Sequence, residues 1–277
     1  MSGPDFLAAM AQSSRRRVSE ARALRSDSDL WACIKELPPA PPLKLDGRFD
    51  LIAELKLKSP AMGVLSGSDE DLEARVLAYA AAGAAVVSVL TEPDRFDGSL
   101  AHLRRASSAL RAAGIPAMRK DFIVDPYQLL EAREAGAGGV LLIVRMLDET
   151  VLQEMLDLAA ALGLFVLLET FDAAEVAIAG RLAATWRGAA SSCLIGVNSR
   201  DLVTLKVVPE RLDELAASLP RDFPRVAESG LQTPDDAARL AGAGYTVALV
   251  GTALMSASDP VTLASEMIRH GRSRGLP

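Results

Sequence analysis

Short apolar runs recur along the 277-residue chain, and most of them stop at or beside a charged residue, an amide or a glycine-bearing turn. Successive run ends are 22 to 36 residues apart, which leaves room for one helix and two loops between them. The run ends are Glu54, Leu90, Lys120, Leu142, Glu169, Asn198, Glu228 and Gly251. This rhythm predicts an α/β fold, the (β/α)8 or TIM barrel, which carries catalytic groups at the carboxyl ends of its strands.

The expected strands are short and apolar on both faces, as parallel strands covered by helices should be. They span residues 50–55, 84–90, 115–118, 139–143, 165–168, 193–197, 225–227 and 246–250. Amphipathic helices are expected between them, for example over 69–82 and over 233–243, where Thr233 would cap the helix and proline would begin it. Left-handed C-caps are expected at the glycines that follow such helices, which are Gly83, Gly114, Gly136, Gly163 and Gly244.

One domain is expected over residues 1–277, with an N-terminal extension and connector over 1–48. Residues 4–34 have a helical pattern, and the proline-rich stretch 37–43 is typical of a stiff extended connector. Three consecutive arginines, at 15–17, could form an anion site, but a solvated helix face is the preferred interpretation.

The formal net charge of −6 argues against a nucleic acid or an anionic membrane as the main partner, so a small molecule is expected. Cys33 and Cys193 cannot build a disulfide framework and lack the neighbours of a zinc site, which fits a reducing cytoplasm. No signal peptide and no long apolar span is evident. His102 and His270 lie in helical contexts away from strand ends, and no catalytic role is expected for them.

Glu54, Lys56 and Lys58 alternate where the first strand ends, so their side chains should share the face that points into the barrel mouth. Buried charges of this kind are costly unless they are paired or used. A salt bridge that plugs the barrel is the alternative, and a binding and proton-transfer cluster is favoured.

The third strand ends in Arg119, Lys120 and Asp121, so only one of the two bases can face inward. For an inward Lys120, a desolvated cationic neighbourhood would lower the pKa and favour its use as an acid. Glu169 ends the fifth strand, either as a cap of the sheet edge or as a general base opposite Lys120.

Asn198, Ser199 and Arg200 follow the sixth strand and offer an amide, a hydroxyl and a guanidinium to a ligand, although Arg200 with Asp201 could instead brace the loop. After the seventh and eighth strands, glycines free backbone amides, and a short helix over 252–256 could point its N-terminus at the mouth. That arrangement is a phosphate site in TIM barrels, so the ligand should be a phosphoester.

Eight segments together resemble the indole-3-glycerol phosphate synthases of tryptophan biosynthesis. The segments are AELKLKSPAMG (53–63), SVLTEPDRFDGSL (88–100), RKDFIVDPYQLLEAREAG (119–136), VLLIV (140–144), LLETFD (167–172), IGVNSRDL (195–202), VAESGL (226–231) and LVGTALM (249–255). By position, the resemblance implies that Lys120 is the general acid and Glu169 the general base, with Phe96 and Leu141 beside an aromatic moiety. The implied catalytic residues are Glu54, Lys56, Lys120, Glu169, Asn198 and Ser229, and the implied substrate-binding residues are Lys58, Ser59, Phe96, Leu141, Arg200, Glu228, Gly230, Gly251 and Thr252.

The resemblance further implies conversion of 1-(2-carboxyphenylamino)-1-deoxyribulose 5-phosphate to indole-3-glycerol phosphate, carbon dioxide and water by a monomer without metal or cofactor. Departures from the family pattern are the long segment 181–193, Asp97, Lys206 and Thr252, and they leave open a substrate with a modified ring. A phosphoribosylanthranilate isomerase would need a cysteine near the first strand, which carries Glu54 instead. The tryptophan synthase α subunit is another phosphate-binding rival, while a non-catalytic phosphometabolite-binding barrel should lack an acid or a base.

Overall fold

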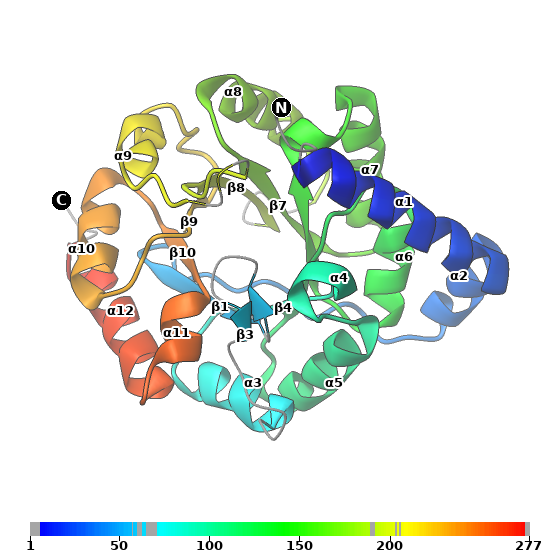
Figure 1. Cartoon of the computed structure of the whole chain (residues 1–277), viewed down its shortest axis with the longest axis horizontal. Coiled ribbons are helices and arrows are strands. Elements are labelled where there is room, and N and C mark those ends of the chain that lie inside the picture. Colours follow the sequence, from blue (N-terminus) through cyan, green and yellow to red (C-terminus); the bar gives the residue numbers. More distant parts are fainter. Residues whose placement is uncertain are drawn as a thin grey trace.

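Residues 6–56, 58–59, 63–64, 71–188, 192–202, 204 and 206–274 are described by the structure, which is a computed structural model. Parallel strands among them close into one barrel (Figure 1). The barrel strands are β1 (Asp50–Leu55), β4 (Val86–Leu90), β5 (Ala117–Lys120), β6 (Gly139–Ile143), β7 (Phe165–Thr170), β8 (Cys193–Asn198), β9 (Arg225–Glu228) and β10 (Val247–Val250). Each strand pairs with its sequence neighbours, and β10 pairs with β1 to complete the ring. The predicted (β/α)8 barrel is therefore confirmed.

Helices cover the outside of the barrel and return the chain to the next strand (Figure 1). The outer helices are α3 (Leu72–Ala81), α5 (Leu100–Leu110), α6 (Tyr127–Glu134), α7 (Glu149–Ala161), α8 (Ala173–Ala183), α9 (Glu210–Ala216), α10 (Pro234–Ala243) and α12 (Pro260–Arg274). Shorter elements are α4 (Pro93–Phe96), α11 (Thr252–Ser256), the 3-10 turns η1 (Arg111–Ala113) and η2 (Val144–Met146), and an antiparallel pair of β2 (Lys58–Ser59) and β3 (Gly63–Val64). The helix expected over 252–256 is thus present as α11.

The strand limits expected from the sequence agree with the structure to within two residues. Thr233 caps α10 in a reciprocal capping box with Asp236, and Pro234 is its first residue, as expected. The glycines expected in C-caps all have positive φ, between 66° and 105°. The segment 181–193 extends beyond the end of α8 at Ala183, but residues 189–191 of it lie outside the described part of the chain.

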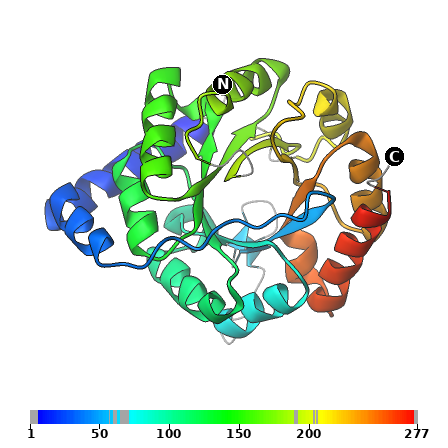
Figure 2. The same cartoon turned by 180° about the vertical axis from the view of Figure 1, so that it is seen from behind.

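The expected N-terminal helical extension is confirmed as α1 (Phe6–Leu24) and α2 (Asp27–Lys35), so the helical pattern over 4–34 is not one continuous helix. Ser26 interrupts the helical segment. Its side chain accepts a hydrogen bond from the backbone N–H of Asp29, and the Asp29 side chain accepts one from the backbone N–H of Ser26. This capping box satisfies donors that a helix start leaves unpaired, so a new helix begins there. The connector that follows, residues 36–49, crosses the rear of the barrel as an extended chain (Figure 2).

Apolar side chains fill the barrel interior, among them Ile52, Met118, Leu167 and Val226. Polar residues follow two positions further along the same strands, at Glu54, Lys120, Glu169 and Glu228. Because strand side chains alternate, both sets face inward, with the polar layer nearer the carboxyl end. No helix within the described residues is long and apolar enough to cross a bilayer.

Candidate active site

A cavity of about 460 Å³ opens at the carboxyl ends of the barrel strands. Every implied site residue whose side chain is described lines it. These residues are Glu54, Lys56, Phe96, Lys120, Leu141, Glu169, Asn198, Arg200, Glu228, Ser229, Gly230, Gly251 and Thr252. The side chains of Lys58 and Ser59 lie outside the described part of the structure. The fold thus gathers residues that are up to 198 positions apart in sequence, from Glu54 to Thr252, around one space.

Acidic and basic side chains meet at the floor of this cavity. Lys56 Nζ donates to Glu54 Oε1 at 2.9 Å. Lys120 Nζ lies between two carboxylates, 4.0 Å from Glu54 Oε2 and 3.6 Å from Glu169 Oε2. All four residues line open space, so their ion pairs do not plug the barrel.

The expected lowering of the Lys120 pKa is wrong. Burial does lower this pKa, but the charges of Glu169, Glu54 and Glu228 outweigh burial and raise it above the usual lysine value. The error came from counting the sequence-adjacent cations rather than the carboxylates that other strands bring into the mouth. For Glu54, burial raises the pKa, but Lys56 and Lys120 together pull it below its usual value. Lys120 is therefore an ammonium and Glu54 a carboxylate at neutral pH.

Glu228 behaves differently from Glu54. Burial and the nearby Glu169 charge raise its pKa well above the usual value, although Lys120 opposes the shift. Neither of its carboxyl oxygens has a hydrogen-bond partner among the described residues, and the same holds for Glu169 Oε2.

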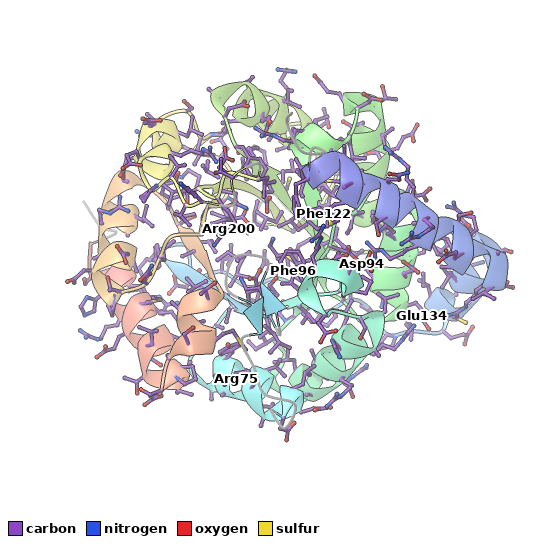
Figure 3. The ribbon with its side chains drawn as sticks, in the orientation of Figure 1. Arg75, Asp94, Phe96, Phe122, Glu134 and Arg200 are labelled. Carbon is purple, nitrogen blue, oxygen red and sulfur yellow. The ribbon has the colours of Figure 1, made fainter. Side chains whose placement is uncertain are left out.

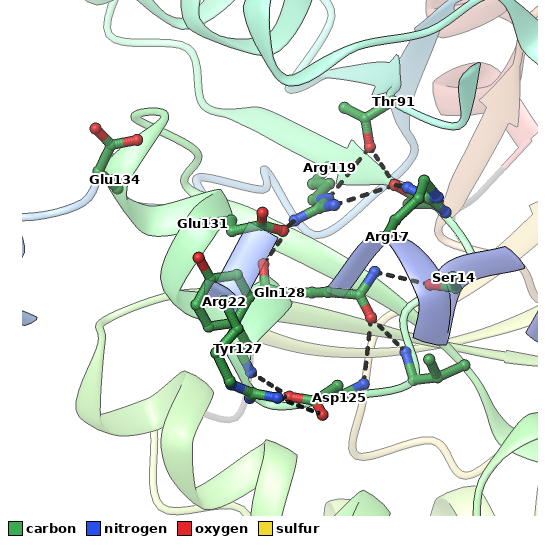
Figure 4. Close-up of polar contacts among 12 residues, drawn as sticks. Ser14, Arg17, Arg22, Thr91, Arg119, Asp125, Tyr127, Gln128, Glu131 and Glu134 are labelled. Carbon is green, nitrogen blue, oxygen red and sulfur yellow. Dashed lines mark hydrogen bonds and ion pairs between the residues drawn. The ribbon is translucent and has the colours of Figure 1, made fainter. Parts of the chain in front are cut away.

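The outward side of β5 carries a second charge cluster (Figure 4). Asp121 accepts from Arg119 Nη2 at 3.1 Å, from Thr91 Oγ1 at 2.7 Å and from both terminal nitrogens of Arg17 at 2.8 and 3.1 Å. Arg119 and Lys120 therefore face opposite sides and Asp121 forms an ion pair, as the sequence predicted. The solvated face expected for the arginine run is wrong for Arg17, whose guanidinium docks α1 on the barrel because a buried carboxylate needs a partner there.

An aromatic wall borders the cavity opposite Arg200 (Figure 3). Phe96 and Leu141 were implied there, but Phe122 and Phe6 of α1 were missed. The Phe122 ring centroid lies 5.7 Å from that of Phe6 and 6.3 Å from that of Phe96. Phe6 belonged to the apolar pattern of an amphipathic helix, and periodicity alone cannot distinguish a ligand contact from core packing.

Asn198 ends β8 with its side-chain orientation fixed. Its Oδ1 accepts from the backbone N–H of Arg200 at 2.9 Å, which leaves the amide NH₂ group to donate into the cavity. The suggestion that Ser199 offers its hydroxyl to a ligand is wrong. Ser199 is fully buried, and its Oγ lies 3.1 Å from the carbonyl oxygen of Ser229, because the side chain following Asn198 points to the other side of the strand.

The loop after β9 and the start of α11 form the opposite end of the cavity. Ser229 and Gly230 both have positive φ, 68° and 85°. Gly251 precedes α11, and a Cβ atom at this position would overlap the Glu54 carboxylate. The first turn of α11 leaves backbone N–H groups without helical acceptors, as any helix start does. Among the described residues, no group of three or more His, Cys, Asp or Glu is arranged to hold a metal ion.

A closed parallel barrel with an acid–base cluster at its carboxyl end defines a TIM-barrel enzyme. Solved structures that share this fold include thiamine phosphate pyrophosphorylase from Pyrococcus furiosus, with a TM-score of 0.59 and 16% identity over 82% of this chain and 97% of that one. The 3-hexulose-6-phosphate synthase from Salmonella typhimurium has a TM-score of 0.61 and 15% identity over 82% of this chain and all of that one. At these identities, the likeness shows the fold alone.

Sequence comparison identifies the family. The model of indole-3-glycerol phosphate synthase matches residues 9–267. The indole-3-glycerol phosphate synthase of a Nocardioides species is 43% identical over 250 residues, covering 89% of this chain and 91% of the relative. That of Mycolicibacterium smegmatis is 37% identical over 283 residues, covering 100% and 98%. The chain belongs to the indole-3-glycerol phosphate synthase family, whose members are carboxy-lyases of tryptophan biosynthesis.

Proposed function

We propose that the cavity binds 1-(2-carboxyphenylamino)-1-deoxyribulose 5-phosphate and that Lys120 and Glu169 are the acid and base that convert it to indole-3-glycerol phosphate. The observation that carries this assignment is the position of Lys120 Nζ, held 4.0 Å from Glu54 and 3.6 Å from Glu169 at the floor of the cavity. An acid and a base this close can act on neighbouring atoms of one small substrate.

Ring closure begins with a bond between the carboxyl-bearing aromatic carbon and the ribulose carbonyl carbon. The carbonyl oxygen takes a proton from the Lys120 ammonium as this bond forms. Carbon dioxide then leaves, and the electrons of the broken bond restore the aromatic ring. The new hydroxyl then takes a proton from Lys56 and leaves as water while Glu169 removes a proton from the adjacent carbon, which completes the indole, and proton exchange with solvent restores Lys120, Lys56 and Glu169.

The raised pKa of Lys120 suits this role, because the acid must hold its proton until the carbonyl oxygen is attacked. A developing alkoxide is a stronger base than any amine, so the proton then moves readily. Before that point, Lys120 and Lys56 are placed to attract the carboxylate that will depart as carbon dioxide.

The two ends of the cavity match the two ends of this substrate. Phe6, Phe96 and Phe122 supply aromatic contact for the anthranilate ring. At the other end, backbone amides near Gly230 and at the start of α11 are suited to bind the phosphate. The remaining implied groups, including the Asn198 amide, line the space between. The family resemblance also favours a monomer located in the cytoplasm. Sedimentation of the purified protein would measure its mass and so test whether it is a monomer.

Indole fluorescence on mixing the purified protein with the proposed substrate tests the reaction. We expect a signal from the wild type without added metal or cofactor. Lys120→Ala and Glu169→Gln should each lower kcat by about 10² or more, the loss typical of positioned acid–base groups. Lys44→Ala, at an exposed position in the connector, is the matched control and should behave as wild type.

Near-normal turnover in both Lys120→Ala and Glu169→Gln would contradict the role assignment. A folded wild type that binds phosphate but gives no indole signal would instead direct the search to substrates with a modified ring.

A further inference from the structure

The hydroxyl of Ser199 joins two loops that line different ends of the cavity. Its Oγ lies 3.1 Å from the carbonyl oxygen of Ser229 and 3.3 Å from that of Glu228, and its backbone N–H donates to the Glu228 carbonyl at 2.9 Å. Ser199 is fully buried and does not line the cavity. Its contacts therefore act between the end of β8 and the loop after β9 rather than on a ligand.

Arg211, in the first turn of α9, holds the end of β8 from the other direction. Its Nη1 donates to the backbone oxygen of Asn198 at 3.0 Å, and its Nη2 lies 3.9 Å from Asp201 Oδ2. The Val208 N–H donates to the Ser199 carbonyl at 2.8 Å, which closes the base of this loop. The Arg211 side chain is only 18% exposed, so its guanidinium is built into the loop rather than lying on the surface.

We propose that Ser199 and Arg211 form a brace of two positioning residues that fixes the substrate-contacting groups of both loops in one arrangement. The brace rests on the proposed function, because those groups are the Asn198 amide and the Ser229–Gly230 turn. Ser229 has a φ of 68°, which residues with a side chain adopt only at an energetic cost. The Ser199 hydroxyl binds the carbonyl of that residue and offsets the cost.

The two halves of the brace have separable effects. Ser199 acts on the turn that leads to the phosphate end, so its loss should weaken ground-state binding. Arg211 acts on the peptide of Asn198, whose amide faces the reacting part of the cavity, so its loss should misplace a group beside the chemistry. Small displacements of such groups cost rate steeply.

Steady-state kinetics with inorganic phosphate as competitive inhibitor would test the brace. Ser199→Ala should raise both KM and the phosphate inhibition constant by about tenfold and leave kcat within about twofold. Arg211→Met should lower kcat by about tenfold and leave the phosphate constant within about twofold. Ser107→Ala removes another buried hydroxyl, one without a hydrogen-bond partner in the described structure, and Arg239→Met removes an exposed ion pair with Asp213. Both controls should match wild type.

The brace is overturned if Ser199→Ala and Arg211→Met show wild-type constants while Lys120→Ala is inactive, a result that would leave the proposed function standing. Equal changes in the brace variants and their controls would also overturn it. If the wild type does not turn over the proposed substrate, amide hydrogen exchange and calorimetric measurement of phosphate binding still test whether the brace exists. Ser199→Ala must then speed exchange in residues 228–232 and weaken phosphate binding, and Ser107→Ala must do neither.

Discussion

The two sides of strand β5 carry charge clusters of opposite character. Outside the barrel, the two oxygens of Asp121 accept hydrogen bonds from Arg17, Arg119, Thr91 and the Phe122 backbone N–H. Inside the barrel, one oxygen of Glu169 and both oxygens of Glu228 have no hydrogen-bond partner among the described residues. Arg119 and Lys120, adjacent residues of β5, thus face different surroundings: Arg119 binds a carboxylate whose two oxygens both have partners, whereas Lys120 lies among carboxylates that have oxygens without one.

This difference separates a structural role from a chemical one. A saturated network of buried charges holds elements in place, and breaking it is costly because the remaining charges stay buried. An unsaturated cluster lowers stability, and it is retained where a ligand will supply the missing partners. Substitutions outside the barrel should therefore change stability, whereas substitutions inside should change turnover.

Asp121→Asn should give the largest stability effect. The substitution removes the carboxylate charge that pairs with both Arg119 and Arg17, so their two guanidinium groups lose their anionic partner. We therefore expect a loss of about 3–5 kcal/mol in the free energy of unfolding. Urea unfolding followed by circular dichroism measures this loss. A change below about 1 kcal/mol would show that the outer cluster does not carry the structural role assigned to it.

The pH dependence of stability gives a second test of the structural role of Asp121. Burial raises the Asp121 pKa, but Arg119 and Arg17 outweigh it and lower the pKa to about 2 from 3.8. Because the folded-state pKa is the lower one, the stabilisation is present above the unfolded value and is lost as the pH falls through the folded value. The stability gap between wild type and Asp121→Asn should therefore stay constant from neutral pH to about 4 and shrink toward pH 2.

Arg17→Met should have a smaller effect, about 1.5–3 kcal/mol, because Asp121 keeps Arg119 and Thr91 as partners. Arg22→Met is the matched control on the same helix. Arg22 also binds a carboxylate with two nitrogens, that of Asp125, but its side chain is 40% exposed, so we expect at most about 1 kcal/mol. Thermal unfolding of the two variants measures the difference, and equal losses would mean that burial does not set the strength of these contacts.

Much of this arrangement could be predicted from the sequence, because strand ends and strand alternation are local properties. The alternation alone placed Lys120 and Arg119 on opposite sides, and the spacing of run ends placed Glu169 and Glu228 at the same mouth. The roles proposed for the individual residues come from the family resemblance.

Contacts between distant segments could not be predicted in this way. Arg17 in an arginine-rich helix looks solvated until the fold places Asp121, 104 residues away, beneath it. The Lys120 pKa depends on carboxylates from three other strands, and Phe6 becomes part of the cavity wall only because α1 docks there. The break between α1 and α2 was local and could have been found, since Ser26 and Asp29 have the spacing of a capping box.

Glu228→Gln should have the smallest effect on stability and the opposite sign. The folded-state pKa of Glu228 is raised, so the wild type is fully stabilised below the unfolded value near 4.5 and loses stability as the pH rises toward the folded value. Gln cannot ionise, so the variant should be more stable at neutral pH, by about 1 kcal/mol, and the difference should vanish near pH 4.5. Its turnover should fall, because an amide cannot exchange a proton with the Lys120 and Glu169 groups beside it. Urea unfolding at several pH values and the indole assay measure both quantities. A variant that is less stable at neutral pH would show that the inner cluster, like the outer one, serves the fold.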